Sequence, residues 1–162
     1  MQIRGMRAED TEGYLECQLE VFESLRGTLP PAFIESEISW LREKGRAWVE
    51  GAIKDPERIN LVAEDGGSIV GMATGRVGRG GLSTLGFMGV IPSMRRKGIG
   101  WQLLETFIEE SRRRGAAKVT LNTASELKPA IKLYVEMGFL PEGLLRRHIH
   151  GVDAIVYSRF LD

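Results

Sequence analysis

The chain has 162 residues, which is enough for one domain with a substantial core and too few for two, so we predict a single domain over residues 1–162. It carries 22 Lys and Arg against 22 Asp and Glu, so no overall charge favours a nucleic acid or an anionic membrane as partner. No apolar run approaches the ~18 residues that span a bilayer, and no apolar leader follows Met1, so we expect a cytoplasmic protein.

The first third of the sequence predicts one strand and two helical segments. Residues 2–7 have the pattern of a strand, and Asp10 is a suitable N-cap for the helix that follows. Apolar residues at helical spacing mark that helix: Leu15, Leu19 and Phe22. The only cysteine, Cys17, lies within it, which excludes an internal disulfide and indicates a small buried side chain. A second helical pattern covers residues 34–52 and is interrupted at Gly45.

The rest of the chain alternates between strand and helix patterns. Two β-rich runs at 59–64 and 68–77 flank a glycine turn and predict a hairpin. The further predicted elements are a strand ending at Val90, a helix from Gly98 to Arg114, a strand at 118–122, a helix at 125–137, and strands at 139–145 and 153–160. The strands before and after the helix at Gly98 should be parallel neighbours, because a helical crossover joins them.

The turn that opens the helix at Gly98 combines positive charge with small residues. Its sequence is Arg95, Arg96, Lys97, Gly98, Ile99 and Gly100. The first N–H groups of a helix lack intrahelical partners and form the positive end of the helix dipole, so an anion such as a phosphate is the natural ligand. Glycine lets that ligand approach the backbone. A dinucleotide fingerprint is excluded because Leu103 replaces its third glycine, and no GxxxxGK[ST] motif occurs.

These residues resemble a known family. Residues 95–100 match the R/Q-x-x-G-x-G/A signature of the GNAT superfamily of acyl-CoA-dependent N-acyltransferases, and residues 90–92, VIP, stand at the expected distance before it. Residues 133–139, LYVEMGF, look like the LYxxxGF segment of the same family, and the resemblance covers residues 59–160. It implies an α/β (α+β) fold in which a mixed, largely antiparallel sheet of about six to seven strands has a central parallel pair and about four flanking helices on both faces.

The resemblance also implies acetyl-coenzyme A as co-substrate, with its pyrophosphate held by residues 95–100. The strand ending at Val90 would splay from its parallel neighbour, and the pantetheine arm would enter the gap and pair with backbone groups of Met88 and Val90. Glycines inside that strand, here Gly86 and Gly89, often mark a bulge or a close backbone approach. The implied cofactor-binding residues are Met88, Gly89, Val90, Arg95, Arg96, Lys97, Gly98, Ile99, Gly100, Asn122, Lys128 and Tyr134.

Two of these residues receive catalytic roles from the same resemblance. The N–H of Val90 would stabilise the oxyanion that forms when an amine attacks the thioester. Tyr134 would protonate the departing thiolate, for which a phenol with a reference pKa of about 10 is a suitable donor. The alternative for Tyr134 is a core tyrosine on an apolar helix face, and the alternative for the strand glycines is a role in packing alone.

The general base is not assigned. Many family members use a carboxylate on the central strand, but residues 85–90 contain none, so we expect a water relay instead. The candidates for its end are Glu126, Glu142, His148 and His150. No third ligand joins the two histidines, so we predict no metal site. Leu127 stands where many members have an asparagine. We expect Asn122 to supply the lost contact to pantetheine, with an ordinary turn residue at a strand end as the alternative. We expect Lys128 to reach the adenosine phosphate, with a solvated lysine as the alternative.

The predicted reaction is direct transfer of an acetyl group from acetyl-CoA to a primary amine, since no cysteine or serine is placed as an activated nucleophile. The acceptor is left open between a protein N-terminus or lysine, favoured by an open groove, and a small amine, favoured by a closed pocket. A catalytically weak acyl-CoA-binding sensor or interaction module is the alternative function. Residues 112–114, three arginines, are explained by the helix dipole and by pairing with Glu109 and Glu110, so we expect no nucleic-acid partner. A homodimer is expected because dimers are common in the resembled family.

Overall fold

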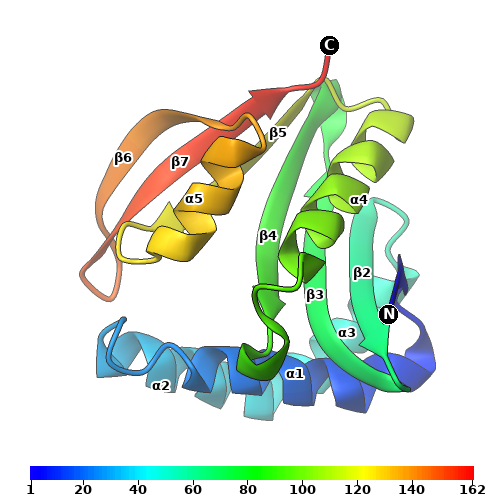
Figure 1. Ribbon diagram of the computed structural model, residues 1–162, viewed down its shortest axis with the longest axis vertical. Coiled ribbons are helices and arrows are strands. Elements are labelled where there is room, and N and C mark those ends of the chain that lie inside the picture. Colours follow the sequence, from blue (N-terminus) through cyan, green and yellow to red (C-terminus); the bar gives the residue numbers. More distant parts are fainter.

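A computed structural model describes residues 1–162. Seven strands form one sheet in the order β1-β2-β3-β4-β5-β7-β6 (Figure 1). The strands are β1 (Gln2–Gly5), β2 (Arg58–Asp65), β3 (Ser68–Val77), β4 (Leu82–Val90), β5 (Lys118–Ala124), β6 (Leu140–Ile149) and β7 (Val152–Phe160). Strands β4 and β5 are parallel, and all other neighbours are antiparallel. The predicted mixed sheet with one parallel pair is therefore confirmed.

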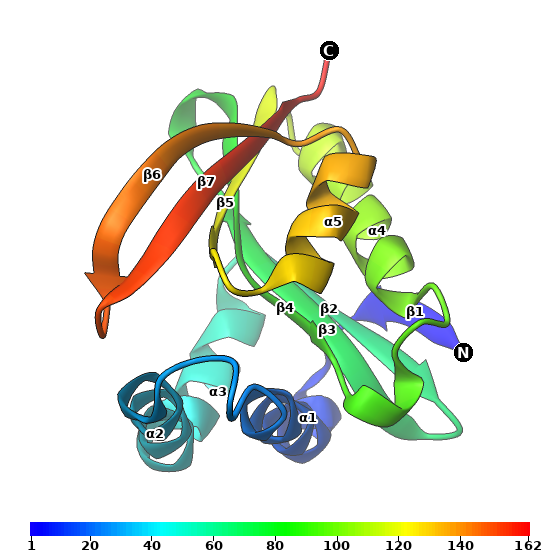
Figure 2. The same cartoon turned by 60° about the vertical axis from the view of Figure 1, so that its left-hand side comes forward.

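Helices cover both faces of this sheet. They are α1 (Thr11–Glu23), α2 (Pro31–Trp40), α3 (Arg46–Lys54), α4 (Ile99–Arg113) and α5 (Lys128–Glu136). Figure 2 shows α1, α2 and α3 on one face and α4 and α5 on the other. A π-helical turn, Leu41–Gly45, joins α2 to α3, so the predicted interruption at Gly45 is confirmed. Gly45 packs closely on α1 there, since an added Cβ would lie 2.8 Å from Cδ2 of Leu15.

The two faces of the sheet have separate apolar clusters. On one face, Leu103, Leu104 and Phe107 of α4 are fully buried, as the amphipathic pattern of that helix predicted. On the other face, α1 and α3 pack on β2 and β3 through a smaller cluster: Tyr14, Cys17, Val49, Val62 and Met72. The side chain of Cys17 is 3% exposed, which confirms the predicted buried cysteine. Each face of the sheet thus fixes one set of helices independently of the other.

Asp10 lies at the predicted N-cap position of α1, but its side chain has a different role. Asp10 lies in a 3₁₀ turn, Ala8–Asp10, and its side chain makes no capping bond to α1. Its carboxylate instead accepts two hydrogen bonds from the Arg4 guanidinium, at 2.7 and 2.8 Å, and one from the N–H of Arg7 at 2.7 Å. A charged, two-point partner displaces the weaker bond to the helix backbone.

Several predicted boundaries also shift. The first strand ends at Gly5, and α5 begins at Lys128 because the preceding residues form a turn. Strand β6 continues to Ile149, past two irregularities in its pairing with β7. At the end of α4, Glu110 takes the ion pairs of both Arg113 and Arg114, and Glu109 takes none.

Candidate functional site

The parallel strands β4 and β5 separate within the sheet. Their pairing covers Leu82–Thr84 and then stops, although β4 continues to Val90 (Figure 1). The register between β3 and β4 skips Gly86, which is the extra residue of a β-bulge. The predicted bulge is confirmed. Because a bulge bends its strand and raises the local twist, it accounts for the turning of β4 away from β5.

Backbone groups of β4 are left open along this gap. The N–H of Ile91 donates to the carbonyl of Val70 in β3 at 3.0 Å. Backbone groups of successive residues point to opposite sides of a strand, so those of Met88 and Val90 point away from β3 and into the gap. These are the two residues whose backbone was predicted to meet a pantetheine arm.

The turn between β4 and α4 has the geometry of an anion site. Gly98 is the N-cap of α4 with φ +79°, a left-handed conformation in which other residues are strained. No side chain caps the helix, so its first N–H groups remain available to a ligand. Ile99 is 3% exposed and anchors the first turn in the core. An added Cβ on Gly100 would lie 3.5 Å from Cδ2 of Leu133, so α5 stands beside the start of α4.

The three basic residues of the turn differ in their surroundings. Arg95, predicted as a mobile charge, is held at two points: Nε donates to the carbonyl of Val90 at 2.9 Å, and Nη2 donates to Oγ of Ser24 at 2.7 Å. Arg96 is exposed and makes no ion pair, and Lys97 is exposed with Nζ 3.4 Å from Sδ of Met94. Arg96 and Lys97 therefore supply the free positive charge, whereas Arg95 joins the turn to β4 and α1.

Tyr134 lies on α5 with its ring in the core. It is 6% exposed, and its ring centroid is 6.0 Å from that of Phe139 and 6.4 Å from that of Tyr157. The hydroxyl makes no hydrogen bond to the protein, and burial raises the pKa of Tyr134 to about 12. The phenol is therefore protonated across the physiological range. This geometry suits a proton donor, and equally a packed core tyrosine.

The remaining predicted coenzyme residues flank the gap on the β5 side. Asn122 is exposed and lies in β5 beyond the last residue that pairs with β4. Lys128 is the exposed first residue of α5 and has no ion-pair partner. Leu127 is half-buried and packs against the apolar cluster that includes Phe22. A leucine at this position thus makes an apolar contact where an asparagine would present an amide.

The four predicted ends of a proton relay are not equivalent. Glu142 lies 2.8 Å from Nζ of Lys118 and accepts from Oγ of Ser158 at 2.7 Å, and these bonds hold the pKa of Glu142 below its usual range. It is therefore a poor proton acceptor. Glu126 accepts a hydrogen bond from Ser125 at 3.2 Å. The two histidines, His148 and His150, are exposed, and no group of three metal-ligating side chains is present.

A family model described as the acetyltransferase (GNAT) family matches residues 19–139. The chain belongs to this family. The predicted resemblance is thereby confirmed. Two solved structures agree with the fold. PaiA N-acetyltransferase from Thermoplasma acidophilum, crystallised with coenzyme A, has a TM-score of 0.83 at 19% identity and covers 99% of this chain and 98% of its own.

A second similar structure is ribosomal-protein-alanine N-acetyltransferase from Brucella melitensis, with a TM-score of 0.71 at 25% identity over 99% of this chain and 100% of its own. The spore coat polysaccharide biosynthesis protein SpsD of Bacillus subtilis (strain 168) is 27% identical over 133 residues, which is 82% of this chain and 45% of that protein. The chain thus spans less than half the length of this relative. No helix of the GNAT chain is both long and apolar enough to cross a membrane.

The β6–β7 hairpin of this GNAT chain makes a contact with α2 that the sequence did not predict. The tip of the β6–β7 hairpin rests on α2, because Val152 is 5% exposed within a cluster that includes Ile34 and Ile38. The ring of His150 at this tip lies 6.2 Å from that of Phe33. The tip of the hairpin and α2 are therefore in contact.

Glu37 of α2 lies at this meeting point and was missed by the sequence analysis. It makes no hydrogen bond or ion pair, and burial raises the pKa of its carboxyl, against a smaller opposing effect of His150. One signal was available in the sequence. Glu37 lies between Ile34 and Leu41 on the apolar face of α2. Burying a carboxylate there costs free energy, and such residues are often found at functional sites.

Proposed function

We propose that this chain is an N-acetyltransferase that moves an acetyl group from acetyl-CoA directly to a primary amine. The observation that supports it best is the open edge of β4, where backbone groups of Met88 and Val90 face the gap beside the uncapped start of α4. Acetyl-CoA needs such an arrangement, because its diphosphate and its amide-containing pantetheine arm must both be held for the thioester to be in a fixed position. A similar GNAT structure, PaiA, is crystallised with coenzyme A.

In this proposal, the pyrophosphate and the pantetheine amides of the coenzyme bind to backbone groups of the protein. The N–H groups of residues 98–100 hold the pyrophosphate, with Arg96 and Lys97 adding charge at the rim. Met88 pairs with a pantetheine amide along β4, which leaves the N–H of Val90 for the thioester carbonyl. The absent side chain of Gly89 lets α1 approach, since an added Cβ would lie 2.8 Å from Val21. The remaining contacts come from the far side of the gap, where Asn122 meets the pantetheine arm and Lys128 the adenosine phosphate.

The chemistry needs no covalent enzyme intermediate. The amine nitrogen attacks the thioester carbonyl carbon, and the N–H of Val90 stabilises the resulting oxyanion. The carbon–sulfur bond then breaks, and Tyr134 donates a proton to the departing thiolate. Cys17 takes no part as a nucleophile, because it is buried and burial raises the pKa of its thiol to about 12.

Glu37 is our candidate for the end of the proton relay. The amine must lose a proton during transfer, and β4 has no carboxylate to take it. Glu37 lies on α2 beside His150 at the tip of the β6–β7 hairpin, is free of ion pairs, and has a pKa that burial raises toward neutral pH. Water between Glu37 and the bound amine completes the path.

The test is a free-thiol release assay with acetyl-CoA and a panel of amines, run beside calorimetry of coenzyme binding. Thiol release that depends on an amine supports the enzyme. Coenzyme binding without thiol release would instead support the alternative, a sensor that binds acyl-CoA. The absence of a carboxylate in β4 favours this alternative. No binding at all would overturn both. A single domain, a cytoplasmic location and a homodimer stay predictions.

A further inference from the structure

Arg58, at the start of β2, is a half-buried cation. Its guanidinium lies over Trp48 of α3, with Cζ 4.8 Å from the ring centroid. Nη2 donates to Oγ1 of Thr74 at 3.1 Å, the only hydrogen bond that this side chain makes. Nε is buried without a partner. Burial lowers the pKa of Arg58, yet a guanidinium remains charged at every physiological pH.

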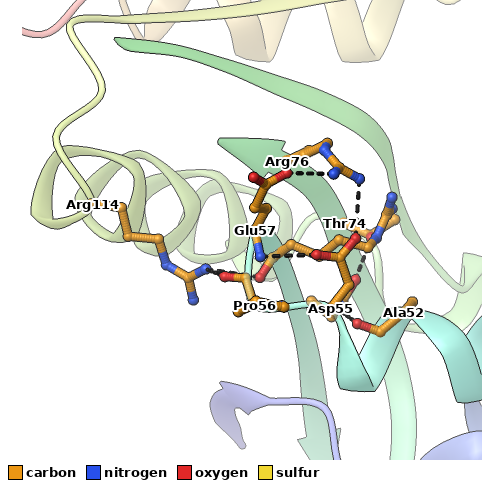
Figure 3. A network of polar contacts seen from close by, with 9 residues as sticks. Ala52, Asp55, Pro56, Glu57, Thr74, Arg76 and Arg114 are labelled. Carbon is orange, nitrogen blue, oxygen red and sulfur yellow. Dashed lines mark hydrogen bonds and ion pairs between the residues drawn. The ribbon is translucent and has the colours of Figure 1, made fainter. Parts of the chain in front are cut away.

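No carboxylate forms an ion pair with Arg58. Asp55 accepts from Nη1 of Arg76 and from the N–H of Glu57, both at 3.0 Å. Glu57 also pairs with Arg76, and Figure 3 shows these carboxylates turned toward it. Arg76 lies directly opposite Arg58 in the β2–β3 register and so has two anionic partners where Arg58 has none. Asp55 acts on Arg58 only through a longer-range attraction that partly offsets the effect of burial on the pKa of Arg58, so Arg58 is the half-buried arginine of the two that has no direct ion pair.

Arg58 borders a cavity on the face covered by α1, α2 and α3. The cavity has a volume of about 260 Å³ and is lined by Ala47, Trp48, Gly51, Ala52, Asp55 and Arg58. Small residues of α3 leave room beside one aromatic ring and one guanidinium. Two buried polar atoms on α1, Oη of Tyr14 and Oε1 of Gln18, also lack partners, and the Tyr14 ring stacks on Trp48 with centroids 6.2 Å apart.

The Arg58 guanidinium is anchored on β3, the strand next to the bulge of β4. Thr74, which holds the Arg58 guanidinium, is directly opposite Phe87 in the β3–β4 register, next to the bulge at Gly86. Directly opposed side chains share a face of the sheet, and Phe87 packs on Phe22 of α1 with centroids 5.2 Å apart. Neighbouring strands are ~4.8 Å apart, so the guanidinium is about one strand spacing from the bulge, on the side away from α4.

We propose that Arg58 binds a carboxylate of the acceptor, so that the acceptor is a small amine that also carries a carboxylate, as an amino acid does. This inference rests on the proposed function and names the substrate class of the same site. The planar fork of a guanidinium matches a carboxylate at two points, and Trp48 supports its plane. Asp55 lines the same cavity and repels a phosphate, which carries up to two negative charges, more strongly than a carboxylate, which carries one.

The test compares straight-chain ω-amino acids with their carboxamides as acceptors in the thiol release assay. The two series have the same length and nearly the same amine basicity, so the ratio of their kcat/KM values reports recognition of the carboxylate alone. We expect the acid to be preferred by about tenfold or more at the best chain length, the usual effect of a hydrogen bond to a charged group. That length measures the distance from the bulge to Arg58.

Three variants complete the design. In Arg58→Gln the preference for the acid should fall to near unity, and in Arg58→Lys it should recover only in part, because lysine keeps the charge without the fork. Arg46→Gln is the control, since Arg46 is an exposed arginine of α3 that pairs with Glu12 and does not line the cavity, and it should keep the preference. Circular dichroism establishes that each variant is folded.

Turnover of acids and carboxamides at equal rates by the native protein would overturn the inference and leave the proposed function intact. A preference for the acid that survives in Arg58→Gln would overturn it as well. Absence of thiol release with every amine would overturn the proposed function, and this inference with it.

Discussion

Arg95 donates a hydrogen bond to the carbonyl of Val90 at 2.9 Å while its other end bonds Ser24 at the end of α1. One side chain thus joins the turn that would hold a diphosphate to the strand that would hold a thioester. The sequence assigned Arg95 to the ligand, which stays a prediction, and the structure adds these two contacts within the protein.

Replacing Arg95 tests this link. In Arg95→Ala the turn loses both anchors, so we expect the dissociation constant for coenzyme A to rise about tenfold, the usual effect of losing hydrogen bonds to a charged group. Arg95→Lys should recover little, because an ammonium cannot bridge the same two acceptors. Calorimetry measures both. An unchanged affinity in Arg95→Ala would mean that the turn keeps its shape without the bridge.

The left-handed conformation of Gly98 gives a second prediction. Gly98→Ala strains the backbone by about 1–2 kcal/mol, and should weaken coenzyme binding because the turn presents its N–H groups from this point. Gly27→Ala is a matched control: Gly27 also has a positive φ, +84°, with no atom near its Cβ position. Urea unfolding should show a similar loss of stability in both variants. Only Gly98→Ala should lose affinity, and equal affinities would count against an anion site at this turn.

A third prediction concerns Tyr134. Because its hydroxyl makes no hydrogen bond, Tyr134→Phe should unfold at the same urea concentration as the native protein and bind coenzyme A equally well. Turnover should fall about a hundredfold or more, as expected when a general acid is lost. Tyr157→Phe is the control, since Tyr157 is equally buried and packs against the same ring. Unchanged turnover in Tyr134→Phe would mean that Tyr134 serves only to pack the core.

Glu37 yields a prediction in pH. A base acts when deprotonated, and burial raises the pKa of Glu37, so kcat/KM of the native protein should fall as the pH drops through that raised pKa. In Glu37→Gln this acidic limb should disappear and kcat/KM near neutral pH should be about a hundredfold lower. Glu35→Gln is the control, because Glu35 is exposed on the same helix and pairs with Arg26. An acidic limb that persists in Glu37→Gln would assign the base elsewhere.

Local patterns carried the sequence analysis far. The order of strand, basic turn and amphipathic helix around Gly98 predicted the parallel pair, and a glycine in β4 predicted the bulge, because both depend on neighbouring residues. Contacts between distant segments were not predictable. The docking of Val152 on α2 and the two-point hold on Arg95 depend on how the hairpin and α1 arrive in space. The special surroundings of Arg58 could not be predicted from the sequence, because Arg58 lacks an ion pair only because Asp55 pairs with Arg76 instead.

Gly45 has a consequence beyond its own turn. A single added carbon there would meet Cδ2 of Leu15 at 2.8 Å, so the Leu15 side chain on α1 would have to move. Glu37 and Trp48 are carried on the two helices that join at this point, whereas β4 and α4 belong to a different layer. A methyl group at Gly45 would therefore be felt first in the layer of α1, α2 and α3, so the surroundings of Glu37 and Trp48 can be adjusted from a position that touches neither of them.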